Sequence, residues 1–200
     1  MKGIMVLVLL AVAASCGCAT TASTGSPTTC PQDSHAEAEQ VVDQYIAAMT
    51  GGDLETCASL MHPDALKGLQ EILLPIVDMA KQAGRKEQFF TLFADVDSAN
   101  ALRALSQEAF FVSFLKGSLF SQPEIFEAMK NMQYTIIGTA PEGDGVVHVL
   151  YRLKMSMMGT DVEELETISL KQSGDSWRLL LSGDIKNTAE KIKQAFASRF

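Results

Sequence analysis

The chain has 200 residues, of which 16 are Lys or Arg and 24 are Asp or Glu, so its formal net charge is −8 at pH 7. This length suffices for one sizeable core, and a hydrophobic fraction of 47% is typical of globular proteins. The acidic balance argues against nucleic acid as a partner and against basic anchoring to anionic lipid, because both need clustered Lys and Arg.

The first eighteen residues have the layout of a secretory signal that is cleaved at a cysteine. Lys2 precedes an apolar run over 4–12 and a group of small residues that ends at Cys16. The apolar run is too short to span a bilayer, which needs about 20 apolar residues. The segment resembles the lipobox of bacterial lipoproteins. This resemblance implies a lipid-anchored protein of the bacterial cell envelope, on its periplasmic face or cell surface, acylated at Cys16, with Cys18 as second candidate.

Residues 19–34 are rich in Thr, Ser and Pro and contain little to bury, so we expect a flexible tether. Of the four cysteines, Cys30 and Cys57 are the two outside the leader. An exported domain can keep a disulfide, so these two are a candidate pair; the alternative is a spare thiol at Cys30 and a buried side chain at Cys57. No C-x-x-C spacing indicates a zinc site, and no metal or cofactor is expected.

Helical periodicity begins at His35. Apolar residues then recur at steps of three and four, which predicts a helix whose buried face includes Tyr45. The glycine pair at 51–52 should stop this helix, because glycine adopts positive φ without a steric penalty. Asp53 is the expected N-cap of a second, short helix over 54–61.

Further helices are expected before the sheet. His62 precedes a proline and should end the second helix. In the third, Pro75 should introduce a kink or mark a fresh start. Ser98 is an expected cap, and Ser121 with Glu124 forms a capping-box pattern around a proline. The predicted helices cover 64–84, 87–93, 98–116 and 123–132.

After residue 133 the hydrophobic period changes from about 3.6 to 2, which predicts strands. Short turns rich in Gly and Asp separate them, as in an antiparallel meander. Helices followed by strands indicate the α+β class, with a cone-like curved antiparallel sheet of about four strands packed against several N-terminal helices. The predicted strands cover 134–139, 146–157, 162–172 and 177–182, and a last helix covers 188–200.

Two parts of the sequence resemble nuclear transport factor 2-like (SnoaL-like) domains. Residues 39–65 carry G-G-D-L and H-P-D between short helices, and the late strands carry G-D-G-V-V-H-V-L-Y-R and G-D-S-W-R-L-L-L-S-G. The resemblance implies a single α+β domain over 35–200 with a helical insertion at about 66–132. Its cone-shaped fold serves isomerases, dehydratases and non-catalytic binding domains, so fold alone does not decide function.

The strand over 146–157 is expected to turn an apolar face towards the helices. Concave ligand sites are mostly hydrophobic with a few polar groups, so this face is a candidate pocket; the alternative is ordinary core. The candidate pocket residues are Tyr45, Val149, Tyr151, Leu153, Met155, Met157 and Trp177.

The opposite face of that strand carries Arg152 and Lys154. Acidic residues of the next strand could lie across from them, and each pair of opposite charges would stabilise the sheet by about 0.2–1 kcal/mol. We expect a solvated face held in register by such pairs, and the resemblance also makes it a candidate homodimer interface. The acidic residues are Glu163, Glu164 and Glu166.

Acid–base chemistry has few candidates in this sequence. Tyr45 lies on a buried helix face, whereas helix capping accounts for Asp53 and the position before a proline accounts for His62. No acidic residue falls on the inward face of the strand over 146–157, which argues against proton transfer in the cone.

We therefore expect the protein to be a binding or interaction module without catalysis and without catalytic residues. Its expected partners are the membrane, reached through the lipid, and a small apolar ligand held in the cone or another envelope protein. The alternative is a small isomerase- or hydrolase-type enzyme that uses Tyr45 and a helix-borne carboxylate such as Asp53.

Overall fold

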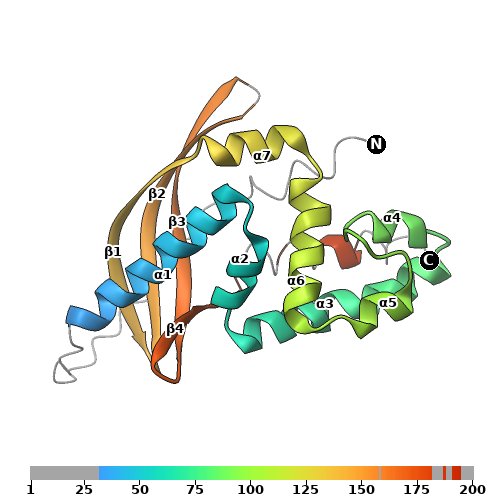
Figure 1. Cartoon of the computed structure of the whole chain (residues 1–200), viewed down its shortest axis with the longest axis horizontal. Coiled ribbons are helices and arrows are strands. Elements are labelled where there is room, and N and C mark those ends of the chain that lie inside the picture. Colours follow the sequence, from blue (N-terminus) through green and yellow to red (C-terminus); the bar gives the residue numbers. More distant parts are fainter. Residues whose placement is uncertain (1–31, 158, 182–186, 188–190, 195–200) are drawn as a thin grey trace.

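A computed structural model describes residues 32–157, 159–181, 187 and 191–194. A curved four-stranded antiparallel sheet carries one long helix across it, and a group of further helices packs beside them (Figure 1). This arrangement confirms the predicted α+β class. The predicted leader with Cys16 and Cys18, most of the predicted tether and most of the last predicted helix lie outside the described residues. None of the helices within the described ranges is long and apolar enough to cross a bilayer.

The sheet is a meander in the order β1-β2-β3-β4. Tight turns join its strands, and glycines at positive φ occupy them, including Gly145 at 70° and Gly174 at 62°. A register shift between Ile136 and Gly138 bulges β1. All four strands were predicted, with somewhat different ends. They are β1 (Gln133–Gly143), β2 (Val146–Met157), β3 (Thr160–Ser173) and β4 (Ser176–Leu179).

The first helix, α1 (Gln32–Gly51), crosses the sheet and contacts β1, β2 and β4 (Figure 1). It begins within the predicted tether. Two hydrogen bonds tie it to β1: Tyr134 Oη donates to Asp43 Oδ1 at 2.9 Å, and Thr139 Oγ1 donates to Glu39 Oε1 at 2.7 Å. Its buried residues follow the predicted periodicity, and they include Ala38, Val42 and Ile46.

The junction between α2 (Leu54–Leu60) and α3 (Pro63–Gln82) is fixed to the sheet edge. His62 ends the second helix as predicted, and its Nδ1 also accepts the Asp64 amide at 3.1 Å, which makes it the N-cap of α3. The His62 amide donates to the Leu179 carbonyl at 2.7 Å. The buried imidazole is thus a structural group.

The helical stretch beyond α2 differs from the prediction in how its helices are divided. The helix α3 continues through Pro75, so no fresh start occurs there. The helix predicted over 98–116 is divided, because Leu105 is extended and Ser106 caps a new helix by accepting the Ala109 amide at 3.1 Å. The helices of this stretch after α3 are α4 (Lys86–Phe90), α5 (Ala99–Ala104), α6 (Gln107–Leu115), the π-helix η2 (Lys116–Phe120) and α7 (Pro123–Lys130).

The predicted capping box before α7 does not form. Ser121 Oγ donates to the Gly117 carbonyl instead, and Gln122 occupies the N-cap position without a side-chain cap. A serine hydroxyl in a helix often donates to the carbonyl four residues before it, and this bond competes with the capping role.

One hydrophobic core joins the sheet to the helical group. On the helical side, the ring of Phe93 lies 5.1 Å from that of Phe110 and 5.5 Å from that of Phe89. On the sheet side, Val149 and Leu170 are fully buried in the same cluster. The helical stretch after α2 therefore shares one core with the sheet.

Candidate functional site

The concave face of the sheet is the site that the sequence predicted. In the register of β2 and β3, Tyr151 lies opposite Glu166, and Leu153 lies opposite Glu164. Side chains of paired residues in an antiparallel sheet share a face. Both carboxylates therefore lie on the same face as the candidate pocket residues, where sequence analysis had placed no acid.

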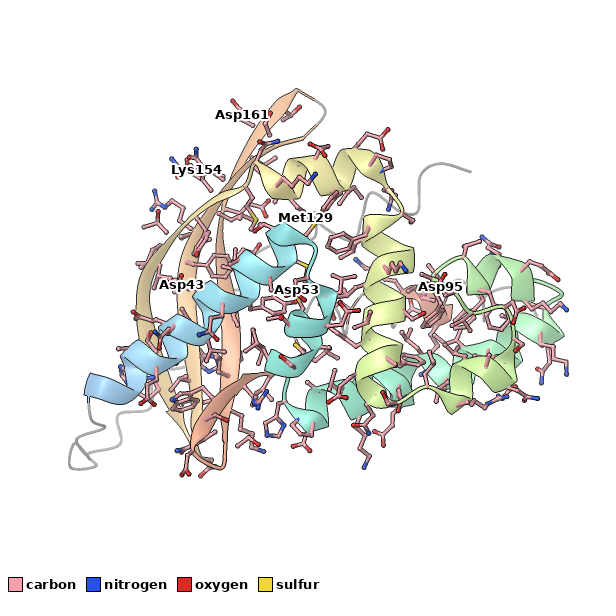
Figure 2. The ribbon with its side chains drawn as sticks, viewed as in Figure 1. Asp43, Asp53, Asp95, Met129, Lys154 and Asp161 are labelled. Carbon is pink, nitrogen blue, oxygen red and sulfur yellow. The ribbon has the colours of Figure 1, made fainter. Side chains whose placement is uncertain are left out.

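This placement corrects the predicted charge pairing on the outer face. Of the three predicted acids, Glu163 alone lies on the outer face, because alternate residues of a strand point to opposite faces. It pairs with Arg152 at 3.0 Å and Lys154 at 3.1 Å. The cations, Lys154 first, hold the pKa of the exposed Glu163 carboxyl below its usual value. Figure 2 shows Lys154 on the side of the sheet away from the helices.

The candidate pocket residues divide into a packed part and a more open part. Val149, Met155 and Trp177 are buried. Tyr151 and Leu153 are half-buried, and the Met157 side chain lies outside the part of the chain that the structure describes. The face is therefore filled around Val149 and more open around Tyr151 and Leu153.

Tyr45 of α1 lies near Tyr151 and Cys57. Burial, and then the proximity of Cys57 and Tyr151, raises the pKa of the Tyr45 phenol well above its usual value. Burial also raises the pKa of the Cys57 thiol to about 12. Both groups are protonated at neutral pH, so Tyr45 can donate a hydrogen bond and Cys57 is no nucleophile.

The buried Cys57 is one half of the predicted disulfide, and Cys30 lies outside the described residues. The Cys57 Sγ lies 4.0 Å from the backbone carbonyl of Tyr45. The pairing of Cys30 with Cys57 stays a prediction.

Asp53 is not brought to the concave face as a free carboxylate. It is exposed at the junction of α1 and α2 (Figure 2), and it caps α2 by accepting the Thr56 amide at 3.0 Å. This backbone hydrogen bond, followed by one from the Thr56 hydroxyl, lowers the pKa of Asp53. Among the described residues no cluster of His, Cys, Asp and Glu could hold a metal ion.

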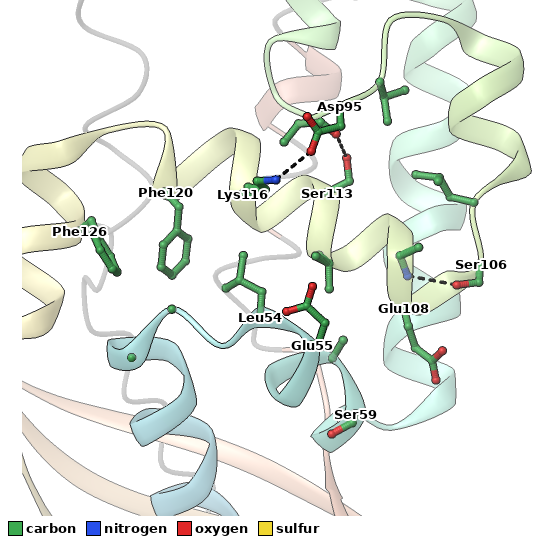
Figure 3. A pocket seen from close by; sticks show the side chains of 18 residues that line it. Leu54, Glu55, Ser59, Asp95, Ser106, Glu108, Ser113, Lys116, Phe120 and Phe126 are labelled. Atoms are coloured by element: carbon green, nitrogen blue, oxygen red, sulfur yellow. Dashed lines mark hydrogen bonds and ion pairs between the residues drawn. The ribbon is translucent and has the colours of Figure 1, made fainter.

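A groove that the sequence did not predict lies between α2 and α6, with a cavity volume of about 990 Å³ (Figure 3). None of the candidate pocket residues lines it. No local signal could have found it, because α2 and α6 are distant in sequence. Residues that line it include Leu54, Glu55, Ala109, Val112, Lys116 and Phe120.

No protein-family profile matches the chain, and no curated protein matches it either. Among solved structures, the chain is similar to an NTF-2-like protein of unknown function from Shewanella oneidensis MR-1, with 11% identity and a TM-score of 0.39. The alignment covers 73% of this chain and 93% of that one. A TM-score this low does not establish a shared fold, so the α+β class rests on the strand order and register described above.

Proposed function

We propose that the protein is a lipid-anchored binding module of the bacterial cell envelope that holds a small, largely apolar ligand on the concave face of its sheet. The observation that carries this proposal is the place of the Tyr45 phenol, which burial keeps in its protonated, hydrogen-bond-donating form, beside the half-buried Tyr151 of the concave face. A ligand with one acceptor atom can take a hydrogen bond from this phenol, and such a bond contributes about 1 kcal/mol.

The assignment of binding rather than catalysis is supported by the groups around Tyr45. The Cys57 thiol stays protonated, and the carboxylate of Asp53 is exposed and occupied as a helix cap. The apolar side chains of Leu153 and Met155 suit an apolar ligand body, and methionine adapts to varied shapes.

A second candidate function is favoured by Glu166. Its carboxylate shares the concave face with Tyr151, and a carboxylate close to a phenol is the pair of groups that acid–base catalysis requires. The alternative of an isomerase- or hydrolase-type enzyme therefore stands with Glu166, in place of Asp53, as its carboxylate.

Native mass spectrometry of the protein purified from its own envelope tests the binding proposal. We expect a bound small molecule whose affinity falls about fivefold in Tyr45→Phe, since one hydrogen bond is worth about 1 kcal/mol. Tyr134→Phe is the matched control, because the Tyr134 hydroxyl is already bonded to Asp43, and it should retain the ligand.

Two results would contradict the binding proposal. They are the absence of any co-purified small molecule, and equal retention by wild type and Tyr45→Phe. If Glu166→Gln keeps the ligand but stops its conversion into a second species, the enzyme alternative is favoured instead.

The lipid anchor has its own test. We expect Cys16→Ala to abolish acyl labelling and to leave an unprocessed precursor, because the thioether to the lipid can form only at the cysteine that follows the cleavage site. Cys18→Ala is the control and should be lipidated normally. Normal lipidation of Cys16→Ala would contradict acylation at Cys16 and would leave Cys18 as the candidate site.

We also propose that a second copy of the chain is a partner, in a homodimer formed through the outer sheet face. Leu165, opposite Arg152 on that face, is 53% exposed, and Ile137 at the β1 bulge is 50% exposed. Burying these side chains against a second copy would remove their apolar area from water, which favours association. The mass of the intact complex, measured in the same native experiment, reports the dimer.

A further inference from the structure

We propose that the groove between α2 and α6 binds a cationic amphiphile, meaning a small molecule with an apolar body and a positively charged amine head. The groove belongs to the helical group and shares no residue with the concave-face candidates. This proposal therefore does not rest on the proposed function of the sheet, and each can fail without the other.

The floor and one end of the groove are apolar. Leu54 and Ala58 of α2 and Ala109 and Val112 of α6 line it. Figure 3 shows the Leu54 side chain on the side of α2 that is turned to α6. The rings of Phe120 and Phe126 are 5.0 Å apart and close the end above the α1–α2 turn. With about 990 Å³, the groove lies at the upper end of the range of about 300–1,000 Å³ that is typical of small-molecule sites.

The charges that line the groove are mostly negative. Asp95 and Lys116 pair at 2.8 Å and offset one another. Glu55 and Glu108 remain, and neither forms an ion pair within the described part of the chain. In Figure 3 the Glu55 side chain points into the groove from α2. A positively charged head is attracted to these two carboxylates, whereas a negatively charged head is repelled.

The wall that carries Asp95 and Lys116 is held rigidly. Ser113 Oγ donates to the Ala94 carbonyl at 2.6 Å, and the Ala94 amide donates to the Ser113 carbonyl at 2.9 Å. Next to this contact, Gly117 of the π-helix lies so close to Phe93 that a Cβ would be 2.6 Å from its backbone. A groove with preformed walls loses less entropy on binding, and π-helical turns often occur at functional sites.

Three probes with the same chain and different heads test the proposal: octylammonium, octanol and octanoate, each added below its micelle-forming concentration to the purified protein. Calorimetry should give the tightest binding for octylammonium, by about tenfold over octanoate at low salt, because the two carboxylates attract the ammonium and repel the carboxylate head. This preference should shrink at high salt.

Variants locate the binding. In Glu55→Gln/Glu108→Gln, octylammonium should bind no better than octanol, while octanol binding is unchanged. Glu124→Gln is the matched control, because Glu124 is also an exposed acid in the first turn of a helix but lies outside the groove. In Ala109→Phe, a larger side chain at an exposed position of α6 should fill the groove and weaken all three probes at least tenfold.

The proposal is overturned if the three probes bind equally, if none binds, or if Ala109→Phe leaves octylammonium binding intact. It is also overturned if a basic amphipathic peptide binds at the groove while octylammonium does not, since the occupant would then be a protein helix. Loss of octylammonium binding in Tyr45→Phe with no effect of Ala109→Phe would place the probe on the concave face instead.

Discussion

Replacing Phe110 with alanine should lower the free energy of unfolding by about 3–5 kcal/mol. Phe110 is fully buried on α6, and its ring lies 5.1 Å from that of Phe93 at the centre of the helical group. Alanine removes the buried ring and leaves a cavity, because close-packed neighbours relax only in part. Urea denaturation followed by circular dichroism measures the change through the unfolding midpoint.

Phe90→Ala is the matched control for this variant. Phe90 is half-buried and touches the same cluster at its edge, with its ring 5.8 Å from that of Phe89. We expect less than half of the loss seen for Phe110→Ala, because the transfer term scales with the buried area. Equal losses would contradict the assignment of Phe110 to the centre of the core.

Replacing Gly117 with alanine should lower the free energy of unfolding by about 1–3 kcal/mol. The reason is steric: a Cβ at this position would lie 2.6 Å from backbone atoms of Phe93. Backbone cannot rotate away as a side chain can, so η2 and the segment around Phe93 have to separate. We also expect octylammonium to bind more weakly to this variant, because the segment that follows Phe93 carries Asp95 at the groove wall.

Gly68→Ala is the matched control for Gly117→Ala. Gly68 lies inside α3, and a Cβ there would meet nothing within 4 Å. Alanine should therefore raise the free energy of unfolding by about 0.5–1 kcal/mol, because glycine is a poor helix former. Replacing glycine with alanine thus changes the free energy of unfolding in opposite directions at the two sites. Stabilisation by Gly117→Ala would show that η2 does not lie against Phe93.

Local sequence signals predicted the elements whose boundaries depend on local chemistry. Asp53 caps α2 as expected, and Gly52 ends α1 at a φ of 77°. The strands followed from the alternation of apolar and polar residues, and tight turns made them a meander. The same reasoning failed at Ser106 and Ser121, because a serine can cap a helix or bond to a preceding carbonyl, and its neighbours in space decide which.

The two concave-face glutamates were missed although a signal existed. Ile168 and Leu170 of β3 face the helices, and Glu164 and Glu166 share their parity along the strand. Applying the period of 2 to β3 as well as to β2 would have placed both acids inward. Only the register, however, puts Glu166 opposite Tyr151, because strand pairing is set between strands and not within one.

The sequence by itself determined α1 to α3, the four strands, their antiparallel order and the apolar face of β2, since periodicity and turn chemistry act over a few residues. The tertiary structure alone decided that Tyr45 meets Tyr151 and Cys57, and that α2 and α6 enclose a groove with Glu55 and Glu108 on its rim. These residues come from elements far apart in the chain. Their proximity results from burial of the shared core, and burial is non-directional, so no local pattern encodes which faces meet.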